Sequence, residues 1–236
     1  MTRRRWIADE TSGNTAALTG EHAAHLVRVL RAQVGQEFEL STGDSIRVGR
    51  ITAIRDSRVE FELGQIIPVR EVLDLTLLLA IFKFDRMEWA IEKCTELGVS
   101  KIIPMVANLS DRHLAAAAVK RVERWRRIAR EAAEQSRRAN APEISLPVSL
   151  REGIDQKAEN RILLSEIERD KFLKQVLEQR SRGSLLLAVG PEGGWTAEEN
   201  GAFLRAGWTS ASVGRTILRA ETAAIAAVAV AVSAGQ

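Results

Sequence analysis

The stretch that decides the fold is Gly190-Pro191-Glu192-Gly193-Gly194-Trp195, together with Val213-Gly214-Arg215-Thr216-Ile217-Leu218-Arg219-Ala220-Glu221-Thr222-Ala223 further along the chain. Each half follows a short apolar run, residues 185–189 and 211–213, that has the pattern of a buried strand, and each leads into a helical pattern. We therefore predict two glycine-bearing loops at the carboxyl ends of two strands. In open α/β sheets, ligands bind at that edge.

The first loop, residues 190–194, combines residue types that allow a backbone to approach a ligand closely. Its three glycines carry no side chains, Pro191 stiffens the turn, and Glu192 is the one ionisable group in the loop. Thr196 and Glu199 follow at the spacing of a capping box, in which a hydroxyl and a carboxylate bind free N–H groups at the start of a helix. We expect a loop whose exit into the next helix is fixed.

Length and composition bound the class of protein. The 236 residues, 45% of them hydrophobic, allow one large domain or two modest ones with a sizeable core. The net charge of +3 is too small to indicate a nucleic-acid partner by itself. Cys94 is the only cysteine, which excludes a disulfide within the chain, and His22, His25 and His113 stand in no metal-ligand pattern. We expect no bound metal.

The sequence indicates no membrane segment. Met1-Thr2-Arg3-Arg4-Arg5-Trp6 has a charged start without an apolar run behind it, so we expect no secretory signal. The apolar tract from Ala223 to Ala234 is shorter than the ~20 residues that a membrane-spanning helix needs. We expect a soluble, cytoplasmic protein without a membrane partner.

Residues 1–70 are predicted to form a first domain, a small β-barrel or curled sheet. One helical pattern, residues 20–31, interrupts it, with Leu26, Val29 and Leu30 on one face and the arginines of this pattern elsewhere. Alternating polar and apolar residues, the period-two pattern of half-buried strands, occur at 37–40, 45–48 and 58–63.

Residues 71–236 are predicted to form a second domain of the α/β class. Strands at 75–82 and 99–106 enclose a helix at 86–97, and this alternation is typical of a largely parallel sheet. Cys94 lies on the apolar stripe of that helix, which favours core packing over a catalytic thiol.

The most basic helical pattern covers residues 115–138. Between residues 112 and 138, nine Lys or Arg residues stand against three Glu residues, a local net charge of +6. One interpretation is a solvated helix with i,i+4 ion pairs such as Arg127 with Glu131, and the other is a surface that faces RNA. The clustering favours the RNA-facing surface. Three arginines at positions 3–5, next to Trp6, likewise favour phosphate contacts and stacking.

The strings GPEGGWTAEE at 190–199 and VGRTILRAETA at 213–223 closely resemble the signature of the RsmE family, the methyltransferases that modify uridine N3 in 16S ribosomal RNA. ELGV at 96–99, EQSRR at 134–138 and HLVRVLRAQVG at 25–35 resemble further segments of this family, so the likeness covers nearly the whole chain. The resemblance implies a C-terminal SPOUT domain, an α/β fold with a trefoil knot around S-adenosylmethionine, and an N-terminal PUA-like β-barrel that holds RNA. It also implies a homodimer that acts on the small ribosomal subunit.

The resemblance implies roles for particular residues. Arg219 is expected to stabilise negative charge that develops on the uracil ring, and Glu221 to orient Arg219 or to act as the base, unless the two only pair to fix the loop. Expected RNA-binding residues are Arg3, Arg4, Arg5, Arg28, Arg31, Gln135, Arg137 and Arg138. The expected cofactor-binding residues are Leu164, Ala188, Val189, Gly190, Glu192, Gly193, Gly194, Val213, Gly214, Ile217, Leu218, Thr222 and Ala223.

Two other functions stay open. The first is a SPOUT methyltransferase that acts on another RNA, which nucleoside mass spectrometry would reveal. The second is a non-catalytic RNA-binding factor in ribosome assembly, which failure to bind S-adenosylmethionine would favour. A nicotinamide-binding Rossmann protein is disfavoured, since no GxGxxG motif follows the first strand of the second domain.

Overall fold

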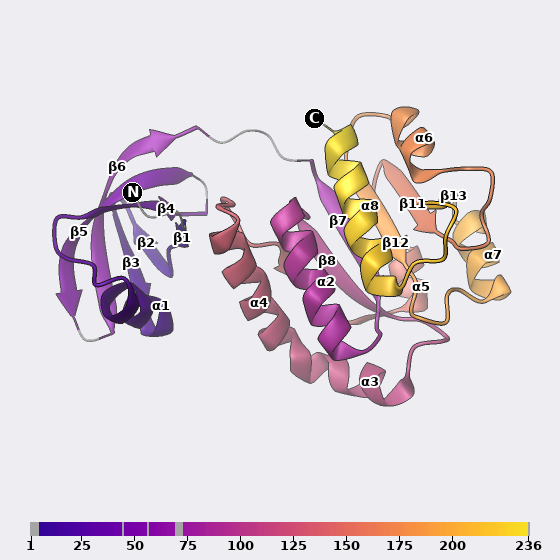
Figure 1. Ribbon diagram of the computed structural model, residues 1–236, viewed down its shortest axis with the longest axis horizontal. Helices are drawn as coiled ribbons and strands as arrows, with labels where there is room; N and C mark the ends of the chain where they lie inside the picture. Colours follow the sequence, from indigo (N-terminus) through magenta and orange to yellow (C-terminus); the bar gives the residue numbers. More distant parts are fainter. Residues whose placement is uncertain (1–4, 44, 56, 69–72, 236) are drawn as a thin grey trace. The chain divides into compact units, whose positions relative to one another are not determined.

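The computed structural model describes residues 5–43, 45–55, 57–68 and 73–235 (Figure 1). The chain divides into two compact units. The first consists of Met1–Glu71 and Arg130–Ala141, and the second of Val72–Ala129 and Pro142–Gln236. Each unit has a hydrophobic core of its own, as expected of a domain.

The first unit is a curled sheet with the strand order β1-β4-β5-β6-β3-β2. Its described strands pair antiparallel, except that β1 pairs parallel with β4. Trp6, Leu18, Leu40 and Phe61 are buried in its core. This curled sheet fits a half-barrel and confirms the predicted architecture. The strands are β1 (Trp6–Ile7), β2 (Glu10–Ser12), β3 (Thr15–Thr19), β4 (Glu37–Ser41), β5 (Ile46–Arg55) and β6 (Arg58–Ile67).

A short helical segment connects β3 to β4 and differs from the expected regular helix. α1 (Gly20–Ala24) continues as a π-helix, η1 (His25–Val29), and Arg31 has a positive φ of 52° just beyond its end. Leu26 is buried, whereas the Val29 residue is 63% exposed. The π-helical i→i+5 hydrogen bonding changes the spacing of a regular helix, which explains why the expected apolar face does not form as a whole.

The second unit contains a sheet with the strand order β10-β8-β7-β12-β11-β13, and β9 also pairs with β8. Every pairing between its described strands is parallel, as the alternation of strands and helices predicts. The strands are β7 (Leu75–Ala80), β8 (Lys101–Val106), β9 (Glu143–Ile144), β10 (Val148–Ser149), β11 (Asn160–Leu164), β12 (Leu185–Val189) and β13 (Thr209–Ala211).

Helices cover both faces of this sheet (Figure 1). Leu77 and Leu79 of β7 pack on one side with α2, α4, α6 and α8, while Leu78 and Ala80 pack on the other side with α5 and α7. Cys94 is fully buried in the first of these cores, which confirms its expected packing role. The helices are α2 (Phe84–Leu97), α3 (Arg112–Ala117), the 3₁₀-helix η2 (Ala118–Arg121), α4 (Val122–Gln135), α5 (Leu150–Ile154), α6 (Leu173–Glu178), α7 (Ala197–Arg205) and α8 (Ala220–Ala234).

The strand order determines where the loops meet. β11 lies between β12 and β13, so the carboxyl ends of these three parallel strands are neighbours at one edge of the sheet. The chain segments that follow them therefore converge there. Among the described residues, none of the helices is both long and apolar enough to span a membrane.

Candidate functional site

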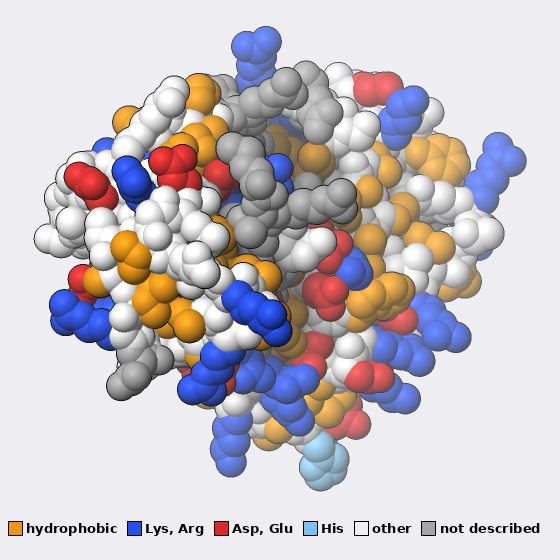
Figure 2. Space-filling model, turned by 60° about the vertical axis from the view of Figure 1, so that its left-hand side comes forward, with side chains coloured by type: hydrophobic (Ala, Val, Ile, Leu, Met, Phe, Trp, Pro, Cys, Tyr) orange, Lys and Arg blue, Asp and Glu red, His pale blue; other side chains and the backbone are white. Residues whose placement is uncertain are grey.

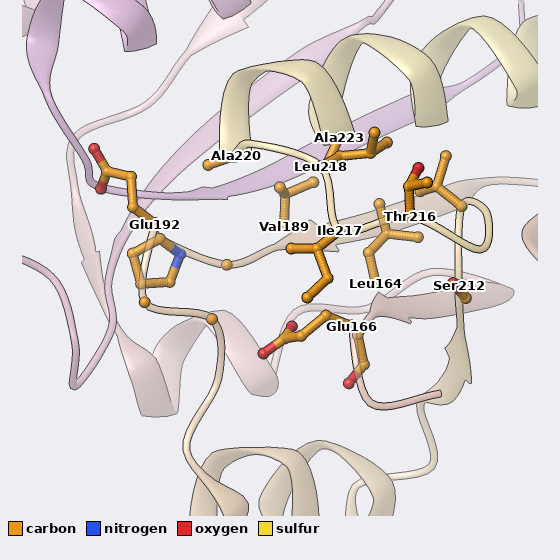
Figure 3. Close-up of a pocket in the computed structure, with 16 residues that line it drawn as sticks. Leu164, Glu166, Val189, Glu192, Ser212, Thr216, Ile217, Leu218, Ala220 and Ala223 are labelled. Carbon is orange, nitrogen blue, oxygen red and sulfur yellow. The ribbon is translucent and has the colours of Figure 1, made fainter. Parts of the chain in front are cut away.

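A pocket of about 290 Å³ lies at the edge of the sheet where the carboxyl ends of β11, β12 and β13 meet (Figure 3). Its walls come from the segments that follow β11, β12 and β13 and from the first turn of α8. The pocket is lined by Leu164, Ser165, Glu166, Val189, Gly190, Pro191, Glu192, Gly193, Gly194, Ser212, Val213, Thr216, Ile217, Leu218, Ala220 and Ala223.

The first loop, residues 190–194, is held by close packing. A Cβ on Gly190 would lie 3.1 Å from the Trp195 ring, and one on Gly193 would lie 3.2 Å from Leu109. Gly194 has a φ of +70°, and its N–H donates to the Pro191 carbonyl over 2.9 Å. Positive φ strains most residues other than glycine, so glycine fits this turn. The loop has little room to move or to accept a side chain.

The exit of the first loop is also fixed. Thr196 Oγ1 accepts the Glu199 N–H over 3.2 Å, and Glu199 Oε2 accepts the Thr196 N–H over 2.8 Å, which confirms the predicted capping box. The other Glu199 oxygen accepts the N–H of Asn108 over 2.8 Å. The Trp195 indole donates to the Leu164 carbonyl over 2.9 Å. The loop is therefore tied to α7, to the segment after β8 and to the end of β11.

The second loop, residues 212–219, is much more open. Ser212 Oγ donates to the Gly214 carbonyl over 2.7 Å, but a Cβ built on Gly214 would have no heavy atom within 4 Å. The Ile217 residue is 84% exposed although it lines the pocket. Arg219 is exposed and forms the N-cap of α8 without a capping hydrogen bond from its side chain.

The pocket contains most of the expected cofactor residues but not all of them. Ala188 is buried inside β12, while Gly214 and the exposed Thr222 also lie outside the pocket lining. The remaining ten expected residues line it. Six further residues line it that the sequence does not predict, namely Ser165, Glu166, Pro191, Ser212, Thr216 and Ala220.

Glu221 lies close to Arg86 rather than forming a pair with Arg219. It is 3% exposed, and its Oε1 lies 3.8 Å from Arg86 Nε of α2. Among the described residues, its Oε2 has no hydrogen-bond partner, and no carboxylate lies within ion-pair distance of Arg219. The reason is geometric, because Arg219 precedes α8 in extended conformation whereas Glu221 lies in the first turn and faces α2.

Two of the expected RNA-binding arginines are joined through a carboxylate in the first unit. Arg5 Nη2 lies 2.8 Å from Glu39 Oε2, and Arg137 donates to the other Glu39 oxygen. Arg5 also donates to the backbone carbonyl of Arg137. Burial alone would raise the pKa of Glu39, but the hydrogen bonds from Arg137 and Arg5 outweigh it and lower the pKa below its usual value. These contacts give both arginines a structural role.

The other expected RNA-binding residues have different environments. Arg3 and Arg4 lie outside the described residues. Arg28, Arg31 and Gln135 are exposed, and burial lowers the pKa of Arg138 to about 10. On the face drawn in Figure 2, Lys and Arg side chains protrude with Asp and Glu side chains between them.

The fold and the pocket define a class of protein. A family model described as an RNA methyltransferase domain matches residues 69–232, and one described as an RNA methyltransferase PUA domain matches residues 18–64. The first match covers most of the second unit and includes the whole pocket. The sheet and pocket described above are therefore those of an RNA methyltransferase domain.

Individual relatives define the family more closely. The ribosomal RNA small subunit methyltransferase E of Rickettsia conorii is 33% identical over 219 residues, which cover 90% of this chain and 87% of the relative. The protein of that name from Synechocystis is 33% identical over 221 residues, covering 91% of this chain and 72% of the relative. The chain belongs to the ribosomal RNA small subunit methyltransferase E family.

Solved structures agree with this assignment. A ribosomal RNA small subunit methyltransferase E from Neisseria gonorrhoeae, bound to S-adenosyl methionine, superposes with a TM-score of 0.85 at 30% identity, covering 96% of this chain and 95% of the other. A putative methyltransferase from Legionella pneumophila, in complex with the same cofactor, superposes with a TM-score of 0.82 at 28% identity, covering 98% and 96%. The trefoil knot implied by the family resemblance stays a prediction.

Proposed function

We propose that this chain methylates uridine N3 in the 16S ribosomal RNA of the small subunit and uses S-adenosylmethionine as methyl donor. The observation that carries the proposal is the pocket, in which a fixed glycine loop faces an open loop that ends at an exposed arginine.

Such an enzyme acts where ribosomes are assembled, so we place it in the cytoplasm. We also propose a homodimer, with the alanine-rich α8 as a flat surface for close packing.

The residues that line the pocket fit this cofactor. Leu164, Val189, Leu218 and Ala223 supply apolar walls suited to an adenine ring. The glycine loop permits a close approach of backbone N–H and carbonyl groups, and we propose that the expected cofactor residues of this loop make those contacts. When bound, S-adenosylmethionine supplies an electrophilic methyl group on a positively charged sulfur.

The proposed roles of Arg219 and Glu221 follow from their environments. Uridine N3 carries a proton, so it attacks a methyl group only as that proton leaves and negative charge spreads to the uracil oxygens. The guanidinium group of the exposed Arg219 stabilises that charge. The burial of Glu221 beside Arg86 supports a role in fixing the first turn of α8, and through it Arg219, rather than in removing the proton.

We propose that RNA is held by the first unit. Arg28, Arg31 and Gln135 are exposed and suited to phosphate and sugar contacts. Arg3 and Arg4 belong to the same proposal on the basis of sequence alone. Arg5 and Arg137 have a different part in it, because both bind Glu39. They support the surface rather than contact phosphate.

The test is a methylation assay with defined products. The purified chain is incubated with labelled S-adenosylmethionine and with small subunits or free 16S RNA from a strain that lacks the activity, and the digested nucleosides are identified by mass spectrometry. The proposal expects 3-methyluridine. A different methylated nucleoside would indicate another RNA target, and absence of cofactor binding in calorimetry would favour a non-catalytic assembly factor. Light scattering of the same sample tests the dimer.

A further inference from the structure

Glu166 is a charged group of the pocket to which neither the family resemblance nor the proposed mechanism gives a role. It lies two residues after the end of β11, the third of the strands whose ends meet at the pocket. Glu166 and Glu192 are the only ionisable residues in the described lining, which contains no Lys, Arg or His. The pocket therefore has a negative charge.

The two carboxylates differ in direction. Glu192 lies at the end of the pocket with its carboxylate turned outward (Figure 3), where Oε1 accepts the N–H of Lys83 over 3.4 Å. Glu166 extends beside Ile217 toward the glycine loop (Figure 3). A Cβ built on Gly194 would lie 2.0 Å from Glu166 Oε1, so the absence of a side chain at Gly194 leaves room for this carboxylate.

No cation compensates Glu166 within the described part of the chain. Arg169 and Lys171 follow it closely in sequence, but they line a different pocket, and no ion pair joins either to Glu166. Glu166 is also exposed, so water solvates its carboxylate, and the charge can stand there without a compensating cation. An uncompensated carboxylate at a pocket wall attracts a positively charged ligand more than a neutral ligand of the same shape.

We infer that Glu166 is a specificity-determining residue, which makes the pocket bind the cationic methyl donor more tightly than the demethylated product. The inference rests on the proposed function.

S-Adenosylmethionine and S-adenosylhomocysteine share their adenine, ribose and amino-acid groups, and they differ by a methyl group and by the positive charge on sulfur. The S–CH₃ bond breaks with its electron pair left on sulfur, while the methyl group bonds to N3 and the N3 proton passes to water. The Glu166 attraction is thereby lost once the methyl group has been transferred, which favours release of the product.

The expected size of the effect is modest because the pocket is open to water. Two unit charges about 6 Å apart change affinity by roughly 100-fold if the effective dielectric constant is about 20, as near a protein surface. With the dielectric constant of bulk water, about 80, the change falls to roughly threefold. We expect an intermediate change of about tenfold in the ratio of the two dissociation constants, which corresponds to about 1.4 kcal/mol.

The experiment measures both dissociation constants by calorimetry in the wild type, in Glu166→Gln and in the control Glu198→Gln. Glu198 is exposed in the first turn of α7 and lies outside the pocket lining. In Glu166→Gln, the Kd of S-adenosylmethionine is expected to rise about tenfold while that of S-adenosylhomocysteine stays within about twofold. Glu198→Gln is expected to match the wild type. Melting temperatures confirm that the variants are folded.

A second measurement varies the salt concentration, in the wild type and in Glu166→Gln. In the wild type, raising the salt concentration from about 0.05 M to 0.5 M is expected to reduce the preference for S-adenosylmethionine, since salt screens the carboxylate. In Glu166→Gln the preference is expected to be insensitive to salt.

Each other outcome overturns the inference in a recognisable way. If both ligands weaken equally in Glu166→Gln, the carboxylate binds a group that they share, such as the ribose hydroxyls, and it does not select by charge. If neither ligand weakens, Glu166 has no part in binding. If the wild type binds neither ligand, the proposed function itself fails, whereas in the first two outcomes that function stands and only the role of Glu166 is rejected.

Discussion

The two loops of the pocket are built in opposite ways. In the loop 190–194, added side-chain atoms at the glycines would meet Trp195, Leu109 or Glu166, and the exit is fixed by a capping box. In the loop 212–219, Gly214 has open space around it and Ile217 is 84% exposed. This difference supports the proposed roles of the two loops, in which the first forms a rigid cradle and the second presents groups to the reacting partners.

The largest effect is expected for Arg219→Ala in the open loop. Methyl transfer in single-turnover assays should fall by at least about 100-fold, because the lost cation no longer stabilises charge on the uracil. The Kd of S-adenosylmethionine, measured by calorimetry, should stay within about threefold, since Arg219 is outside the pocket lining. Arg215→Ala, an exposed arginine of the same loop that also lies outside the lining, serves as the control. A parallel loss of affinity and transfer would assign Arg219 to the cofactor site instead.

The next largest effect is expected for Gly194→Ala in the cradle. Alanine at a φ of +70° is strained by roughly 1 kcal/mol, and its Cβ would displace the Glu166 carboxylate. We expect the Kd of S-adenosylmethionine to rise about tenfold in calorimetry, by the loss of the Glu166 attraction. The matched variant is Gly214→Ala, which meets no atom within 4 Å. Equal effects of the two substitutions would remove the distinction between the loops.

A smaller effect, on stability rather than affinity, is expected for Thr196→Ala. Removing the capping hydroxyl should cost about 1 kcal/mol in the free energy of unfolding measured with denaturant, whereas Arg219→Ala should leave it unchanged. The contrast arises because Thr196 caps its helix through its side chain and Arg219 does not. Similar losses in both variants would show that the start of α8 also depends on its N-cap side chain.

The smallest effect is expected for Ile217→Ala. A side chain on a residue that is 84% exposed contributes little to the pocket as it stands, so the Kd of S-adenosylmethionine should rise by at most about threefold and the melting temperature should not change. A rise of about 30-fold or more in the same titration would show that this loop closes over its ligand and buries Ile217. The open loop would then be a lid.

Local spacing made some of these features predictable. The glycines at 190–194 and the pair Thr196 and Glu199 each belong to one short segment, so the loop and its capping box follow from the sequence alone. Glu166 was not predictable in this way, because its place in the pocket depends on β11 lying between β12 and β13. That order is a property of strand pairing, which periodicity within one strand does not contain.

Charge pairs show the same difference between local and tertiary information. The segment around α4 has a strongly basic sequence, but Arg124 binds Glu88 at 2.7 Å and Arg130 binds Asp9 at 2.8 Å. Both partners are far away in the sequence, so a count of charges along the helix does not reveal them. Arg130–Ala141 belongs to the first unit, where Arg130 binds Asp9 and Arg137 binds Glu39, and a count of charges does not reveal this either.

Cys94 gives this protein a built-in reporter of core opening. Its thiol is fully buried, and burial raises its pKa, so an alkylating reagent finds no reactive thiolate in the closed state. As the only cysteine of the chain, it yields one modification event per molecule. The rate of alkylation at Cys94 therefore measures how often the core beneath α2 and α8 becomes accessible, and a ligand that tightens the second unit will slow that reaction in proportion to its occupancy.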